Sequence, residues 1–201
     1  MPTPVITIGI KITSIAPLLM HNGQLSDPLN PAAKELTRYT NPGRGQKSDL
    51  THNETTYAEF QGSLYFDDVI GPFIPSDNLS AMFVDAAKTV RPSRKNHMLS
   101  SLIMNEDEVP LDYDGPRDRE GLFKDGNFLY RVGARMPGMS GRVQRTRPRF
   151  GQWALTTSAM LNTELMSLAD FERFAQIGGS RIGLGDWRPR YGRFAIEVTQ
   201  L

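Results

Sequence analysis

A segment rich in glycine and arginine near the C-terminus constrains this chain more than any other stretch of its sequence. Residues 178–194 contain five glycines and four arginines, together with Trp187 and Tyr191. Glycine permits positive φ angles and lets the backbone approach a neighbouring group closely. Arginine pairs with phosphate oxygens, and aromatic rings offer flat faces to bases. We therefore expect a loop that holds a phosphate-rich polymer.

The charged residues are distributed unevenly, although the formal net charge is only +1. Residues 1–125 contain 12 Lys/Arg and 17 Asp/Glu, whereas residues 126–201 contain 11 Arg, no Lys and 5 Asp/Glu. Arginine favours planar, bidentate or stacking recognition over diffuse attraction. A solvated basic face is the plain alternative, but two arginine-rich segments interleaved with glycine and aromatic residues favour nucleic acid as a partner.

Composition limits the class of protein. A chain of 201 residues, 39% hydrophobic and 22% charged, is typical of one globular domain with a core, or of one domain carrying a large insertion. No long apolar run is present, and the N-terminus lacks the basic-then-apolar pattern of a signal peptide. The chain has no cysteine, which excludes disulfides and thiol chemistry. We expect a cytoplasmic protein with no membrane partner.

Residue periodicity predicts a mixture of strands and helices. Residues 5–13 alternate between isoleucine and small or polar residues, which predicts a half-buried strand. Ser76 and Ser167 are suited to capping helices, the first stopped at Arg91 and the second at Gly178-Gly179. The other expected elements are a short helix over 31–40 capped by Asn30, an interrupted strand over 57–66, a hairpin around 128–135, a strand over 150–160 and a last strand over 194–199.

The order of these elements predicts the fold class. Strand, helix, strand material, helix and strand follow one another as in an α+β, ferredoxin-like (RRM-like) βαββαβ sheet. Such a sheet carries its helices on one face and leaves the other face open. Single-stranded nucleic acid commonly lies on that open face.

Two segments resemble a known family. Residues 73–82, FIPSDNLSAM, resemble the motif IPGSSLKGALR that opens the first helix of RAMP proteins, the repeat-associated superfamily of CRISPR systems. Residues 178–185 followed by 190–194 resemble the C-terminal glycine-rich loop and final strand of that superfamily. Together with the first strand, these motifs frame the chain from about 5 to 198, whereas the middle matches no pattern of the family.

The resemblance implies a fold and a function. It implies one RAMP-like domain over 1–201, with a palm made from the two ends of the chain and thumb or finger insertions at about 23–57 and 94–148. Members of this superfamily bind RNA, either as backbone subunits that polymerise along a guide RNA or as endoribonucleases that process it with a histidine near the N-terminus. A short stand-alone, prokaryotic or phage-encoded relative fits the length of this chain.

Two groups of residues are candidates for nucleic-acid contact. In the glycine-rich loop, successive amides are suited to cradling phosphate, with Asp186 orienting a neighbouring arginine. In the second group, alternate arginines of an extended strand would lie about 6.6 Å apart, near the spacing of phosphates. The alternatives are a tight turn that packs Trp187 into the core and an edge strand blunted by charge. The predicted contact residues are Gly179, Arg181, Gly183, Gly185, Trp187, Arg188, Arg190, Tyr191, Arg193, Arg142, Arg145, Arg147 and Arg149.

No residue is favoured as catalytic, but two are candidates. His21 follows the first strand, where processing RAMP enzymes often place a general acid or base, and a neutral imidazole can take a 2′-hydroxyl proton. Asp27 lies where target-cleaving backbone subunits carry an aspartate, although Ser26-Asp27-Pro28 is also ordinary turn chemistry. The sequence contains no HExxH, CxxC or P-loop motif, so we expect no metal and no cofactor.

These observations favour a non-catalytic protein whose partner is a single-stranded nucleic acid, with RNA favoured over single-stranded DNA. They also favour a protein that oligomerises along the strand or serves as a subunit of a ribonucleoprotein. One alternative is a metal-independent endoribonuclease that uses His21. Another is a protein-interaction or virion structural module that keeps the fold only.

Overall fold

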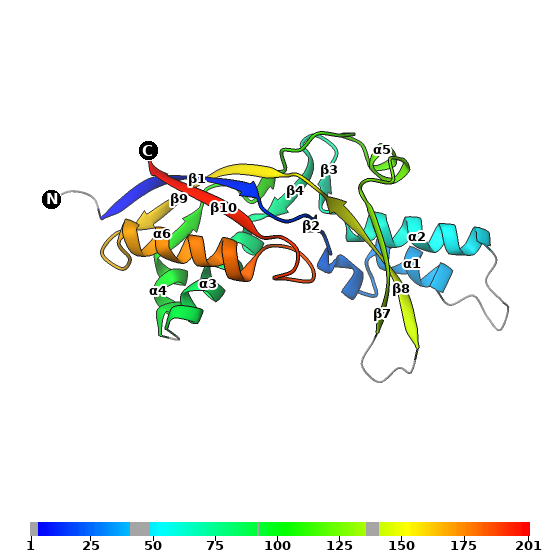
Figure 1. The fold of residues 1–201 in the computed structure, drawn as a ribbon, viewed down its shortest axis with the longest axis horizontal. Coiled ribbons are helices and arrows are strands. Elements are labelled where there is room, and N and C mark those ends of the chain that lie inside the picture. The colour runs from blue at the N-terminus through cyan, green and yellow to red at the C-terminus, as the bar shows by residue number, and fades with distance from the viewer. Residues whose placement is uncertain (1–3, 41–48, 92, 136–140) are drawn as a thin grey trace.

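The computed structural model describes residues 4–40, 49–91, 93–135 and 141–201. The chain is elongated, with a sheet and its helices at one end and a projecting hairpin beside two helices at the other (Figure 1). Both predicted insertions extend in part beyond the described residues, at 41–48 and 136–140.

A four-stranded antiparallel sheet brings the two ends of the chain together. The strand β1 (Val5–Ser14) is central, because it pairs with β10 (Phe194–Gln200) on one side and with β9 (Ala154–Asn162) on the other. The short strand β5 (Leu102–Met104) completes the order β10-β1-β9-β5 by pairing with β9. Val5 thus lies opposite Asn162, and Ile8 lies opposite Gln200.

One face of this sheet is the main core of the molecule. The buried side chains of Ile8, Ile10 and Ile12 belong to a hydrophobic cluster that includes residues of α3 (Ser76–Val90) and α6 (Leu168–Ile177). Phe83 of α3 and Phe171 of α6 meet with ring centroids 5.1 Å apart. The predicted strand over 5–13, the two helices predicted to begin near Ser76 and Ser167, and the predicted last strand are therefore confirmed.

The other end of the molecule is built around a hairpin. The strands β7 (Leu129–Arg135) and β8 (Arg142–Phe150) pair antiparallel, and β2 (Leu18–Leu19) joins the base of β8. Two helices, α1 (Pro31–Thr40) and α2 (Asp49–Ser63), pack against each other, and α2 also contacts β8 (Figure 1). The remaining elements are a 3-10 turn (Gly23–Ser26), β3 (Phe66–Asp67), β4 (Gly71–Pro75), α4 (Arg94–Ser101), β6 (Glu108–Pro110), α5 (Arg119–Lys124) and a π-helical turn (Gly178–Ile182).

The predicted helix caps are confirmed at two of three positions. The amide of Ala32 donates to Asn30 Oδ1 at 2.9 Å, and that of Asp170 donates to Ser167 Oγ at 3.1 Å. Ser76, by contrast, is the first residue of α3, and no side chain caps this helix.

The expected strand over 57–66 is wrong, because α2 continues through Ser63. The buried residues Thr56, Glu59, Phe60 and Ser63 recur at intervals of three and four, which is the period of a helix face. The β-favouring aromatic residues of the segment suggested a strand, but packing against the hairpin decides for a helix.

The glycines terminate α6 as predicted, since the helix ends at Ile177 and Gly178 is its C-cap residue. Gly178 and Gly179 then open the π-helical turn (Gly178–Ile182), whose C-cap residue Gly183 has φ 78°. A Cβ on Gly178 would lie 2.2 Å from Met82 Sδ, and one on Gly179 would lie 2.3 Å from the carbonyl oxygen of Phe194. These positions require glycine because α3 and β10 pass so close.

The alternation of β1 makes a stability prediction. Ile10→Ala is expected to lower the free energy of unfolding by about 2–5 kcal/mol, because it leaves a cavity in the core. The control Lys11→Ala removes an exposed side chain on the opposite face of the sheet and is expected to change the free energy of unfolding by about 0.5 kcal/mol or less. Urea denaturation measures both. Equal losses would contradict the assignment of the two faces.

Candidate nucleic-acid interface

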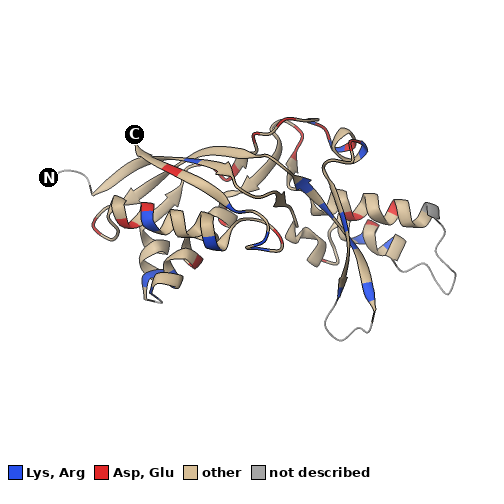
Figure 2. Cartoon of the chain, viewed as in Figure 1, with Lys and Arg blue, Asp and Glu red and all other residues tan. Residues whose placement is uncertain are grey.

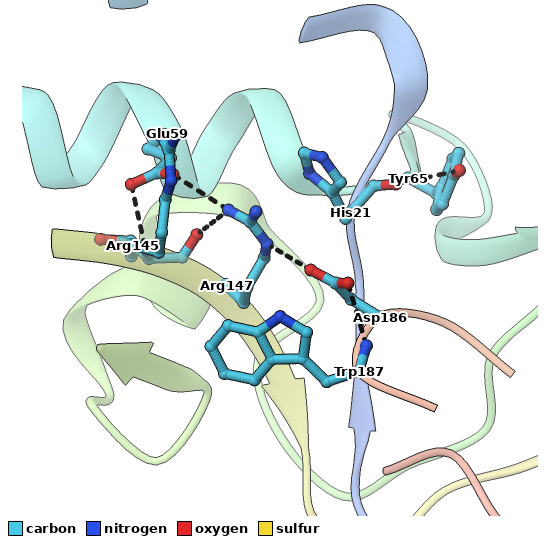
Figure 3. A network of polar contacts seen from close by, with 8 residues as sticks. His21, Glu59, Tyr65, Arg145, Arg147, Asp186 and Trp187 are labelled. Carbon is cyan, nitrogen blue, oxygen red and sulfur yellow. Dashed lines mark hydrogen bonds and ion pairs between the residues drawn. The ribbon is translucent and has the colours of Figure 1, made fainter. Parts of the chain in front are cut away.

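A buried ion network joins the hairpin, helix α2 and the glycine-rich loop (Figure 3). Arg147 of β8 donates from Nη1 to Glu59 Oε1 at 3.0 Å and from Nε to Asp186 Oδ2 at 2.8 Å. Glu59 Oε2 also accepts the amide of Thr146 at 2.8 Å. Arg147 is 7% exposed and Glu59 is 3% exposed. Because an unpaired buried charge is costly, each member fixes the position of the others.

Asp186 extends this network to Trp187. Its Oδ2 accepts a hydrogen bond from Arg147, which agrees with the prediction that Asp186 orients an arginine. Its Oδ1 accepts the backbone amide of Trp187 at 2.9 Å. Trp187 has φ 54°, in the left-handed region, where a residue with a side chain costs about 1–2 kcal/mol. The network therefore holds the Trp187 backbone in a strained conformation at the point where the loop contacts the hairpin.

The amides of the glycine-rich loop bind within the chain. The amide of Leu184 donates to the carbonyl oxygen of Gly192 at 2.9 Å. The amide of Asp186 donates to that of Leu19 at 2.8 Å, and the amide of Gly192 donates to that of Pro17 at 2.8 Å. A Cβ on Gly185, which has φ 76°, would lie 2.2 Å from the oxygen of Leu19. This geometry favours a tight turn over the expected amide cradle. Gly179, Gly183 and Gly185 thus serve the packing of the loop.

The predicted arginines fall into three groups by exposure. Arg147, which we expected to contact phosphate, is buried, and its donors are engaged by Glu59, Asp186 and the carbonyl oxygen of Thr146. Arg145 and Arg149 are half-buried, and Arg145 Nη1 lies 3.4 Å from Glu59 Oε1. The alternation of β8 does place these three side chains on one face, where Arg145 and Arg147 pair with Glu59 of α2 and Arg147 also pairs with Asp186 of the loop. The exposed members are Arg142, Arg181, Arg188, Arg190 and Arg193.

Two further arginines join the exposed group from β7. Arg131 and Arg135 lie on the hairpin and are exposed, and Figure 2 shows basic residues along its strands and in the loop. Within the described parts of the chain, no ion pair involves either residue or the exposed Arg188 and Arg190 of the loop. Cationic side chains from segments some 60 residues apart in sequence thus remain available to an anionic ligand.

An aromatic cluster lies where the loop meets the hairpin. Tyr130 of β7 has its ring centroid 5.7 Å from that of Trp187 and 5.6 Å from that of Tyr191, and the two tyrosine hydroxyls are hydrogen-bonded at 3.0 Å. The hydrogen bond to Tyr130, together with burial, raises the pKa of Tyr191, which keeps its hydroxyl neutral. Tyr130 is not among the contact residues that the sequence predicts, since nothing in the local pattern of β7 indicates contact with a distant loop.

His21 borders a pocket of about 190 Å³ that the sequence did not predict. Tyr65, Asn78 and Arg188 line the same pocket, and Tyr65 donates its hydroxyl to the backbone oxygen of His21 at 3.3 Å. Burial lowers the pKa of the His21 imidazole, and the nearby Arg147 guanidinium lowers it further, so the ring is neutral at pH 7. Figure 3 shows His21 beside the ion network.

Asp27 has the geometry of a turn residue. Its Oδ1 accepts the amide of Leu29 at 2.9 Å, and it is not part of the His21 pocket. The described residues include no group of three or more histidine, aspartate or glutamate side chains placed to hold a metal ion.

The open face of the four-stranded sheet differs from the expected binding surface. Its exposed side chains include Thr7 and Lys11 of β1, Thr156 of β9 and Glu197 of β10. Neither arginine nor an aromatic residue occupies the positions of β1, β9 and β10 that point to this face. The features suited to nucleic acid instead lie at the loop and the hairpin.

Comparison of the chain with protein-family models and with curated proteins finds no match in either set. Among the helices of the described residues, none combines the length and apolar character needed to cross a membrane.

The ion network makes a second stability prediction. Arg147→Ala leaves Glu59 buried without its closest cation and is expected to lower the free energy of unfolding by about 3–5 kcal/mol. The control Arg149→Ala, two residues along the same strand and half-exposed, is expected to cost less than about 1 kcal/mol. If urea denaturation gave both variants similar losses, the network would not have the structural role assigned to it.

Proposed function

We propose that this protein binds single-stranded nucleic acid, RNA in preference to DNA, on the surface formed by the glycine-rich loop and the hairpin. The observation that carries the proposal is that the exposed arginines Arg188 and Arg190 of the loop lie beside a partly exposed aromatic cluster, to which the hairpin contributes Tyr130. Unpaired arginines attract the phosphate backbone, and aromatic rings suit unpaired bases.

The topology of the sheet supports a RAMP-like domain. In the order β10-β1-β9-β5, α3 and α4 are among the elements between β1 and β5, and α6 lies between β9 and β10; this arrangement supports a ferredoxin-like βαββαβ palm. On this reading the helices α1 and α2 and the hairpin are the inserted finger and thumb segments. The resemblance further suggests that the protein acts as a homo-oligomer along the strand or as a subunit of a ribonucleoprotein.

The test of binding removes charge at the proposed surface. The double variant Arg188→Ala/Arg190→Ala is expected to raise the Kd for a labelled single-stranded RNA about ten-fold or more and to flatten the salt dependence of binding. Fluorescence anisotropy at several salt concentrations measures both quantities. The control Lys11→Ala/Lys95→Ala removes the same charge from other exposed positions and is expected to change neither by more than about two-fold. An equal effect in both variants would refute this surface, and absence of binding to any oligonucleotide would favour an interaction or structural module.

A second candidate function is metal-independent cleavage of RNA at the His21 pocket. The pocket sets Tyr65, Asn78 and Arg188 around a neutral imidazole, which adds the partners that the sequence did not indicate. The imidazole would accept the 2′-hydroxyl proton as that oxygen bonds to the adjacent phosphorus, and the Arg188 guanidinium would stabilise the charge that develops on the phosphate. The P–O5′ bond would break to give a 2′,3′-cyclic phosphate, and the leaving 5′-oxygen would take a proton from water.

This second candidate predicts a specific pattern of cleavage. Labelled RNA incubated with the protein in EDTA should be cut, and His21→Ala should abolish cutting while leaving binding intact. Because the pKa of His21 is lowered, the imidazole is a neutral base at pH 7, and the rate of RNA cleavage should be at its plateau there. The rate should fall as the pH drops through that lowered pKa, because the base then becomes protonated. A matched strand of 2′-deoxynucleotides should stay whole. RNA that is shifted on a gel but uncut would leave binding as the function.

A further inference from the structure

We propose that Tyr130, Trp187 and Tyr191 form a stacking site for unpaired bases, so that the protein recognises the bases of a strand as well as its phosphates. This inference rests on the proposed nucleic-acid binding and specifies how the strand is held. It adds a residue of the hairpin, Tyr130, to the binding surface.

The two tryptophans of the chain have contrasting environments. Trp153 is 2% exposed, and its indole N–H donates to the oxygen of Ala16 at 3.0 Å, as expected of a structural residue. Trp187 is partly exposed, and its indole N–H has no hydrogen-bond partner among the described residues. A ring with one polar group unused and one side open to solvent is suited to a ligand.

The backbone at Trp187 supports a role beyond packing. Trp187 adopts φ 54°, which glycine would tolerate without strain, and the carboxylate of Asp186 holds its amide in place. Strained residues with side chains persist where the surrounding structure determines them, and they concentrate at binding sites. The ion network from Glu59 through Arg147 to Asp186 supplies that constraint.

The three rings do not stack face to face on one another. The planes of Tyr130 and Trp187 are inclined at 77°, those of Tyr130 and Tyr191 at 56°, and those of Trp187 and Tyr191 at 55°. None of the three pairs is a parallel stack, so a base can add to the cluster without displacing one ring from another.

Cationic groups lie beside the rings. The guanidinium carbon of Arg190 is 5.5 Å from the ring centroid of Tyr191, and Arg188 follows Trp187 directly in the loop. A base on the cluster would therefore have its flanking phosphates near the exposed arginines, as in the stacking platforms of proteins that bind single strands.

The first test uses the wild-type protein with two probes, a single-stranded RNA and an abasic sugar-phosphate oligomer of the same length. The RNA is expected to bind about 5- to 100-fold more tightly than the abasic oligomer, because only the RNA can stack. The RNA should also quench the fluorescence of Trp187, whereas the abasic oligomer should not. Because no substitution is involved, this comparison does not depend on a variant that folds.

Two variants assign the effect to the cluster. Tyr130→Leu should remove most of the preference for RNA over the abasic oligomer while leaving the affinity for the abasic oligomer within about two-fold, since the arginines are untouched. Trp187→Phe should keep most of the affinity but lose the quenching, because Trp153 is buried. Circular dichroism checks that both variants are folded.

The outcomes separate the two proposals. Tight binding that is equal for RNA and the abasic oligomer, without quenching, would overturn the stacking site and leave the proposed function standing. Binding of neither probe would overturn both. A preference for RNA that survives Tyr130→Leu in a folded protein would place base recognition elsewhere and would also overturn the inference.

Discussion

The buried pairing of Arg147 with Glu59 and Asp186 is the interaction on which the candidate surface depends. It connects β8, helix α2 and the glycine-rich loop, which lie far apart in the sequence. Hydrophobic contact could hold these elements together without defining their mutual angle, but charged hydrogen bonds have direction and are costly to leave unmade. The position of Trp187 follows from this arrangement, because Asp186 accepts its backbone amide.

The same network divides the arginines of the chain into two kinds. Arg147 is engaged in holding the fold, so its charge is not offered to a ligand. The exposed Arg188 and Arg190 of the loop lie beside an aromatic cluster that neither the loop nor the hairpin could build alone. The proposed recognition of a phosphate polymer is therefore assigned to side chains, because the loop amides of Leu184, Asp186 and Gly192 are bonded to carbonyl oxygens of the chain itself.

Local patterns predicted the regular elements where one energetic factor dominated. The isoleucines of β1 alternate without interruption, and Asn30 and Ser167 cap their helices as expected. The prediction of a strand over 57–66 failed. Aromatic residues in this segment favour a strand, but its buried residues are spaced as on one face of a helix. Local patterns also failed to separate Arg147 from Arg145 and Arg149, since strand periodicity reports which side chains share a face and not what covers that face.

The sequence by itself determined a mixed α/β chain and concentrated arginine, glycine and aromatic residues in its last third, because periodicity and composition are local properties. It also indicated that Asp186 would orient an arginine. Only the tertiary structure decided which arginine that is, that the glycines serve close packing, and that Tyr130 and Tyr65 lie beside Trp187 and His21. Such pairings depend on contacts between distant segments, and burial is a property of the whole chain.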